Sequence, residues 1–101
     1  MATTKNPPSI VTCGNAATDF TLESNVVAVL VRNRDATNSA GFNLKQVTQP
    51  GTDPSQDGSN AIVLKAGQEV RLEANGNDKL AYINQATGQA PKLEIIQFLQ
   101  T

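Results

Sequence analysis

The chain has 101 residues, of which 39% are hydrophobic and 17% are charged, and its formal net charge is −1. This length predicts a single domain with a thin hydrophobic core. The eight Lys and Arg residues are scattered among nine Asp and Glu residues. Such a chain lacks the basic surface that displaces counterions from nucleic acid, so we expect no nucleic-acid partner.

The residue inventory excludes several kinds of active site. Without His there is no His metal ligand, general base or His-containing triad. The single Cys13 cannot form an intramolecular disulfide or a Cys-cluster zinc site, and we expect it to be buried. No Ser or Cys has a base to activate it, and no glycine pattern suits phosphate binding. We therefore predict a protein that is not an enzyme, with no catalytic, cofactor-binding or metal-binding residues.

The first eight residues are polar and end in Pro7 and Pro8. Consecutive prolines fix φ and remove two backbone donors, so we predict an extended N-terminal arm over residues 1–8 and a β domain over residues 9–101. Two interpretations of the arm stay open, a disordered terminus and an arm that orders against a neighbouring subunit. No apolar stretch follows Lys5, so we expect no signal peptide and synthesis in the cytoplasm.

The stretch 26–34 is the one around which we expect the chain to be organised. It begins with six consecutive apolar residues, four of them Val, and ends in Arg-Asn-Arg. A run this short and this rich in β-branched residues predicts a central strand covered on both faces. It is far too short to cross a bilayer, so we expect no membrane association.

The remaining segments alternate between apolar and polar residues and are separated by turn signals. The predicted strands cover residues 9–13, 19–23, 26–34, 40–47, 61–64, 68–74, 79–84 and 93–99. A change of parity at Ile95 and Ile96 indicates a β-bulge or burial on both faces. No long window has helical periodicity, so the pattern predicts an all-β chain forming a single antiparallel, jelly-roll-like β-sandwich of about eight short strands.

The polar stretch 48–60 is long for a loop in a compact domain, and such loops are often functional. Asp53, Ser55, Asp57 and Gly58 match the first positions of an EF-hand calcium loop, but Leu64 stands where the bidentate Glu is needed. We therefore predict a solvated loop that is able to contact a partner.

Two groups of charged residues admit more than one interpretation. Arg32 and Arg34 either clamp an anion or a carboxylate of another subunit, or mark the exit of the central strand into solvent, paired with Asp35. Glu69, Arg71 and Glu73 point to the same side of one predicted strand. We interpret them as alternating charges on a solvated sheet face rather than as a carboxylate pair for acid–base catalysis.

The aromatic residues bear on glycan binding. The chain has no Trp, and its aromatic residues fall on positions that we predict to face the core: Phe20, Phe42, Tyr82 and Phe98. A sugar stacks on an exposed flat ring, so this placement argues against a glycan-binding module without excluding it.

Residues 62–72, 80–84 and 93–95 share a pattern with a known family. They read IVLKAGQEVRL, LAYIN and LEI, and they resemble small β-sandwich virion proteins of tailed bacteriophages. In that family a Val-rich central strand ends in Arg-Asn-Arg or similar, and a Leu-x-Ala-Gly-x-x-Val hairpin precedes an Ala-Tyr strand. The likeness spans roughly residues 20–98. Its motifs are structural, so it carries over no active-site residue.

The resemblance implies a capsid decoration (cement) protein of the virion, which binds the head surface and stabilises the shell. Its partners would be the major capsid protein or another virion protein, and copies of itself in a trimer or other symmetric cluster. A head or tail fibre or connector component and a glycan-binding module are the alternatives. We expect partner contacts at Lys5, Pro7, Pro8, Arg32, Arg34, Asp53 and Asp57.

Overall fold

The structure is a computed structural model that describes residues 3–46 and 53–101. Within these ranges the chain forms strands and no helix. The strands are β1 (Thr3–Lys5), β2 (Ser9–Thr12), β3 (Thr18–Thr21), β4 (Val26–Asn33), β5 (Ala40–Lys45), β6 (Ile62–Leu64), β7 (Glu69–Glu73), β8 (Lys79–Asn84) and β9 (Lys92–Gln100). The prediction of an all-β chain is confirmed, and the predicted strands match β2 to β9 to within a few residues.

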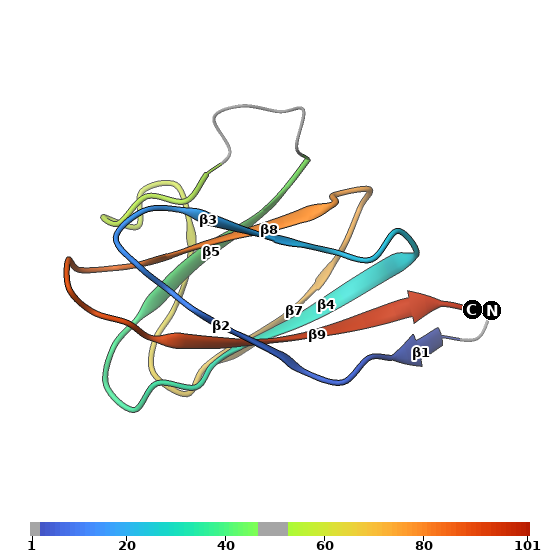
Figure 1. Ribbon diagram of the computed structural model, residues 1–101, viewed down its shortest axis with the longest axis horizontal. Helices are drawn as coiled ribbons and strands as arrows, with labels where there is room; N and C mark the ends of the chain where they lie inside the picture. Colours follow the sequence, from blue (N-terminus) through green and yellow to red (C-terminus); the bar gives the residue numbers. More distant parts are fainter. Residues whose placement is uncertain (1–2, 47–52) are drawn as a thin grey trace.

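The strands form two antiparallel sheets that lie face to face (Figure 1). Sheet A has the order β1–β9–β4–β7, with β2 pairing with β9 on the same side as β1. Sheet B has the order β3–β8–β5–β6. Sheet A has five strands and sheet B has four. Without β1, the two four-stranded sheets connected in this order form a jelly roll, so the sandwich prediction is confirmed.

The order of strand pairing shows that the chain folds as one long antiparallel ribbon. From the ends inward, β2 pairs with β9, β3 with β8, β4 with β7 and β5 with β6. Successive segments of the ribbon alternate between the sheets, and the β4–β9 and β5–β8 pairings complete each sheet. The described loop residues 53–60 therefore lie at the tip of the ribbon, between β5 and β6. Residue 47 of the predicted strand 40–47 and residues 48–52 of the predicted loop lie outside the described residues.

Alternating side chains of the two inner faces form the core. Sheet A contributes Val29 and Leu93, and sheet B contributes Phe42 and Leu80, all 0% exposed. The Tyr82 ring belongs to the same cluster, so its predicted core position is confirmed.

Strand β4 has the interior position that its apolar run predicts, since it lies between β9 and β7. The prediction that both of its faces are covered is wrong. Val29 points into the core, whereas Ala28 and Leu30 lie on the outer face of sheet A. The one register shift recorded for sheet A lies between Val26 and Ala28, in β4 rather than in β9. The parity change in β9 arises because Ile96 is buried on the outer face, at 6% exposed.

The N-terminal arm is extended, and its described part pairs with its own chain. Thr3–Lys5 forms β1 opposite residues 98–100 of β9. Pro7 and Pro8 separate β1 from β2 and are exposed. Because proline cannot donate to the ladder, it suits an edge strand. The sequence does not predict β1, since its three polar residues show no alternation.

Asn33, at the end of β4, joins the two sheets. Its side chain is 0% exposed, and its Nδ2 donates to the carbonyl oxygens of Leu64 in β6 (2.9 Å) and Asn38 (2.8 Å). Its Oδ1 accepts the backbone N–H of Asp35 at 2.9 Å. The Arg-Asn-Arg sequence at the end of the central strand therefore has a structural function at its middle residue.

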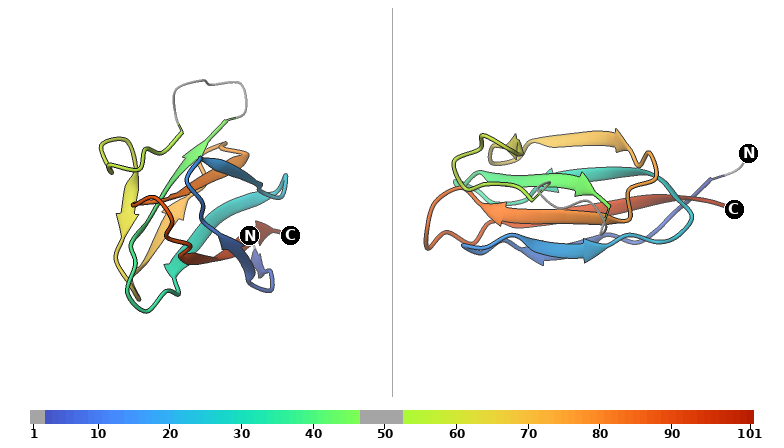
Figure 2. Two further views of the ribbon diagram at one scale, coloured as in Figure 1. Left: turned by 60° about the vertical axis from the view of Figure 1, so that its left-hand side comes forward. Right: turned by 90° about the horizontal axis from the view of Figure 1, so that it is seen from above.

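The molecule is a flat slab, with Cα extents of 42 × 30 × 16 Å. Figure 2 shows its strands from two further directions. In a slab of two sheets, each sheet has one inner face in the core and one outer face. Figure 1 looks along the shortest axis and shows both sheets edge-on, so each outer face spans the longest and the shortest axis. The two outer faces are the flat surfaces on which a partner can bind.

Candidate interaction surface

Four apolar side chains form a strip in the middle of the outer face of sheet A. The register places Phe98 beside Ala28 and Ile96 beside Leu30, in two neighbouring rows across β9 and β4. Ala28 and Ile96 are buried, whereas Leu30 and Phe98 are half-buried. We call these four residues the apolar strip. The guanidinium of Arg71 covers part of it, with its carbon 4.2 Å from the centroid of the Phe98 ring.

The position of Phe98 corrects the sequence-based prediction. A core-type position was expected, but the Phe98 ring lies on the outer face of sheet A and is half-buried there. Strand β9 carries apolar residues on both of its sides, and the sequence does not show which side faces sheet B.

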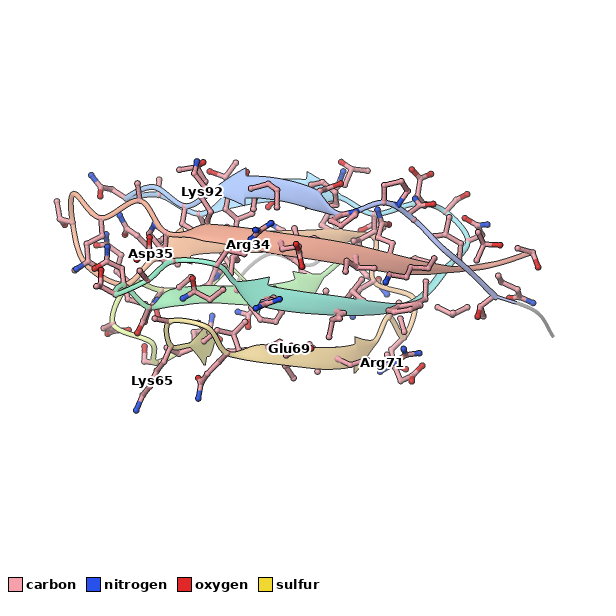
Figure 3. The ribbon with its side chains drawn as sticks, turned by 90° about the horizontal axis from the view of Figure 1, so that it is seen from below. Arg34, Asp35, Lys65, Glu69, Arg71 and Lys92 are labelled. Atoms are coloured by element: carbon pink, nitrogen blue, oxygen red, sulfur yellow. The ribbon has the colours of Figure 1, made fainter. Side chains whose placement is uncertain are left out.

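Charged side chains surround the apolar strip, and we call them the charged frame. On β7, Glu73 lies beside Ala28 and Arg71 beside Leu30. The whole frame, as placed by the strand register, is Lys5, Arg32, Glu69, Arg71, Glu73 and Glu94. Figure 3 looks onto this face, with Glu69 and Arg71 along β7. An apolar centre with a charged margin is the composition expected of a protein–protein contact.

The end of β4 carries Arg34, which pairs with Glu94 rather than with Asp35. Arg34 Nη1 lies 3.1 Å from Glu94 Oε1, and the Arg34 side chain is 53% exposed, so solvent screens the pair. Asp35 Oδ2 instead accepts the backbone N–H groups of Asn38 (2.7 Å) and Thr37 (3.1 Å). These bonds lower the pKa of Asp35. Arg34 therefore belongs to the outer face of sheet A, and Asp35 to the turn beyond it.

The outer face of sheet B, by contrast, is covered by the chain itself. Ala81 and Ile83 point away from the core, yet they are 0% and 5% exposed. The segment 53–60 lies on this side of the sheet (Figure 1), and Asn43 Nδ2 donates to the carbonyl oxygen of Asn60 at 2.6 Å. At Gly41 an added Cβ would come within 2.5 Å of the Gln85 side chain. Glycine is thus required there for the close fit of this cover.

Asn84, at the end of β8, anchors the loop to sheet B. Its side chain is 0% exposed, and its Oδ1 accepts a bond from Gln56 Nε2 in the loop at 2.5 Å. Its Nδ2 donates to Asn15 Oδ1 and to the carbonyl oxygen of Gln89, both at 2.8 Å. One buried amide therefore fixes the loop and two turns at the same end of the sandwich.

The two loop aspartates are occupied by bonds within the fold. Asp57 Oδ1 accepts bonds from Ser59 Oγ (2.7 Å), the Ser59 N–H (2.9 Å) and Ser55 Oγ (2.8 Å), and these bonds lower its pKa to about 2. Lys45 Nζ lies between Asp53 Oδ1 and Asp19 Oδ1, at 2.5 Å and 3.1 Å. The bonds to Asp53 and Asp19 raise the pKa of Lys45.

The residues predicted to contact a partner divide between two separate places. Lys5, Arg32 and Arg34 lie on the outer face of sheet A, and the two prolines lie at its edge. Asp53 and Asp57 lie in the loop against sheet B. The structure therefore brings one group of these residues together around the apolar strip. Their contact with a partner stays a prediction.

Cys13 is buried, as its residue type predicts, and is 1% exposed in the core cluster. Burial raises the pKa of its thiol to about 12. A thiol that is both inaccessible and protonated does not attack a disulfide or a metal ion.

Other kinds of site are not present in residues 3–46 and 53–101. That part of the chain holds no pocket and no group of three or more His, Cys, Asp or Glu side chains that could hold a metal ion. It also contains no helix long and apolar enough to cross a membrane. The outer face of sheet A is thus the strongest candidate surface in the described residues.

Comparison with known proteins finds one fold relationship. No protein family and no curated protein matches the sequence. A solved chain from work on Bacillus endospore appendages, described as a novel family of disulfide-linked pili, has a similar fold. It is 12% identical, with a TM-score of 0.58 over 99% of this chain and 88% of the other. At this identity the likeness concerns the fold alone.

The apolar strip has a signal in the sequence, but this signal does not identify the strip by itself. Alternation in β9 places Ile96 and Phe98 on the face opposite Ile95, and β4 places Leu30 opposite Val31. When neighbouring strands both carry apolar residues on their outer side, they indicate a second buried or interacting face. Recognising this required the pairing of β4 with β9, which the sequence does not reveal.

Proposed function

We propose that this protein is a non-enzymatic structural subunit, which acts by assembling with copies of itself and with another protein surface. The observation that carries the proposal is the outer face of sheet A, where the half-buried Leu30 and Phe98 lie inside the charged frame. In Figure 3, which looks onto this face, no other described part of the chain lies in front of the middle of β4 and β9. Contiguous apolar surface with a polar rim is typical of interaction sites.

The likeness to the pilus chain supports this proposal in one respect. The fold likeness covers 99% of this chain and 88% of the pilus chain. A chain of this fold is thus known from an assembled structure, which supports an assembling role here. The disulfide linkage named for those pili does not fit Cys13, because its thiol is buried in the core. Assembly of this chain would therefore depend on surface complementarity.

The narrower form of the proposal is a capsid decoration protein of a bacteriophage virion, with the major capsid protein as partner. It is supported by the resemblance of residues 62–72, 80–84 and 93–95 to small virion proteins. Fibre or connector components would use the same kind of surface.

Binding to purified phage heads tests the narrower proposal. A decoration protein saturates the heads at a fixed stoichiometry, and a variant that lacks residues 1–8 folds but binds less well if the arm contributes. Failure of the full-length protein to bind would contradict the decoration role. Binding of the isolated domain to a glycan array, abolished by one exposed substitution, would favour the glycan-binding alternative instead.

A further inference from the structure

The strand register gives the outer face of sheet A a regular pattern across its four columns, from β1 and β2 through β9 and β4 to β7. The first row reads Lys5, Phe98, Ala28, Glu73. The second row contains Ile96, Leu30 and Arg71, and the third reads Ile10, Glu94, Arg32, Glu69. Positive charge therefore stands opposite negative charge at the two ends of the first row.

A second copy of the same face fits this pattern when it is rotated about a two-fold axis that runs along the strands. Such a rotation keeps each row in place and reverses the order of the columns. Lys5 then lies over Glu73 of the other copy, and Glu94 lies over Arg32. In the middle, Ile96 lies over Leu30 of the other copy, so apolar side chains meet apolar side chains.

We propose that the outer face of sheet A is a homodimer interface, in which two copies pack sheet against sheet about a two-fold axis along the strands. This inference rests on the proposed function, since it identifies the surface through which copies assemble. An interface of this kind is isologous, with each contact made twice. Sheets that pack face to face keep their strands roughly aligned, which preserves the row-on-row contacts.

Other ways of joining two copies fit the charges less well. A two-fold axis across the strands through the second row would place Glu94 and Arg32 over Phe98 and Ala28 of the other copy, so charges would be buried against apolar groups. It would also place Glu69 over Glu73 of the other copy, so like charges would meet. Symmetric pairing of two β7 edges centred on Arg71 would place Arg71 against Arg71, with like charges directly opposite. The outer face of sheet B is already covered by the loop.

The size of the face sets the expected strength. Strand β4 has eight residues, which gives the face a length of about 26 Å along the strands. Four strand columns give it a width of about 19 Å, so its area is about 500 Å² for each copy. Both copies together bury about 1,000 Å², which is the lower limit for a specific interface. We therefore expect a reversible dimer with a dissociation constant in the micromolar range.

The first test is sedimentation velocity of the full chain over a wide concentration range, with Leu30→Glu as the disrupting variant. The wild-type protein should shift from monomer to dimer, and Leu30→Glu should raise the dissociation constant by about 30-fold or more, as for a central interface residue. The matched control is Val63→Glu, which adds the same charge at an exposed position of sheet B and should dimerise like the wild type.

The second test uses charge exchange between chains and does not depend on the folding of the Leu30 variant. Lys5 and Glu73 are exposed and lie on opposite edges of sheet A, so Lys5→Glu and Glu73→Lys should each weaken the dimer severalfold without changing the monomer. Mixed together, the two variants should form a heterodimer of wild-type strength, because each restores the opposite charges of the other.

The outcomes separate the interface from the broader proposal. If the Leu30→Glu variant self-associates as strongly as the wild type, the protein uses a different surface. The same conclusion follows if the two charge variants fail to form a heterodimer. That result would overturn the inference but leave an assembling subunit. A wild-type protein that stays monomeric at all concentrations would overturn both the interface and self-assembly, whatever else this face binds.

Discussion

The outer faces of the two sheets bury similar apolar residues by different means. Ala81 and Ile83 on sheet B lie under the chain's own loop, which Asn84 holds in place. On the outer face of sheet A, Ile96 is buried and Leu30 stays half-buried. The outer face of sheet B is thus covered by its own chain, whereas the outer face of sheet A keeps apolar side chains available for a partner. Alternation within a strand does not distinguish the two.

The largest expected effect compares the two faces of sheet A itself. Leu93 is 0% exposed in the core, so Leu93→Ala should lower the free energy of unfolding by about 2–5 kcal/mol. Leu30→Ala removes the same atoms from the half-buried outer face and should cost about 1 kcal/mol in the monomer. Urea unfolding at low protein concentration measures both. Equal losses would mean that the outer face is packed as tightly as the core.

The next effect concerns the anchor of the loop on sheet B. Asn84→Leu removes the partner of Gln56 Nε2 and of the Gln89 carbonyl oxygen, and one of the two bonds to Asn15 Oδ1. The free energy of unfolding should therefore fall by about 3 kcal/mol. Asn25→Ala is the control, since its amide makes one exposed bond to the carbonyl of Gln100 and should cost about 0.5 kcal/mol or less. If both variants lose the same amount, Asn84 does not anchor the loop.

A smaller effect is expected for the side chain that covers the apolar strip. Arg71→Gln removes the guanidinium above the Phe98 ring and should cost about 0.5–1 kcal/mol, the range for an exposed cation–π contact. Lys65→Gln, a loss of one exposed positive charge, should leave thermal stability unchanged. A larger loss in the Lys65 variant would show that overall charge, rather than this contact, matters.

The smallest effect is the pH response of the loop. The bonds from Ser59 and Ser55 lower the pKa of Asp57 from 3.8 to about 2, so its charged form stabilises the folded loop above pH 3.8. That contribution is lost as the pH falls from 3.8 towards 2. Amide NMR signals of residues 55–59 should shift in this window and stay constant above pH 5. Asp57→Asn should abolish the response, and loosening of the loop near neutral pH would contradict it.

The fold was predictable from the sequence because its strands carry local signals. Val70, Leu72 and Ala74 alternate with charged residues in β7, and Asn75-Gly76 supplies the positive φ of the following turn. The Val-rich run at the start of β4 has no other interpretation than an interior strand. These features depend on neighbours in sequence, which a single chain displays directly.

The candidate surface was less predictable because it depends on pairing between distant segments. Leu30 and Ile96 are 66 positions apart in the sequence, and only the β4–β9 register makes them neighbours. One of the two interpretations of Arg34 pairs it with Asp35, its neighbour in sequence, but Arg34 pairs with Glu94 on β9. The sequence predicts Lys5, Arg32 and Arg34 as contact residues but does not reveal that they share one face.

The central claim is that copies of this protein associate through the outer face of sheet A. The most direct measurement is the concentration dependence of backbone amide NMR signals of the wild-type chain. We predict that the signals of Leu30, Ile96 and Phe98 shift together as concentration rises, while those of Val63 and Ile83 on sheet B stay fixed. Shifts confined to sheet B, or none at concentrations where the protein self-associates, would contradict the account.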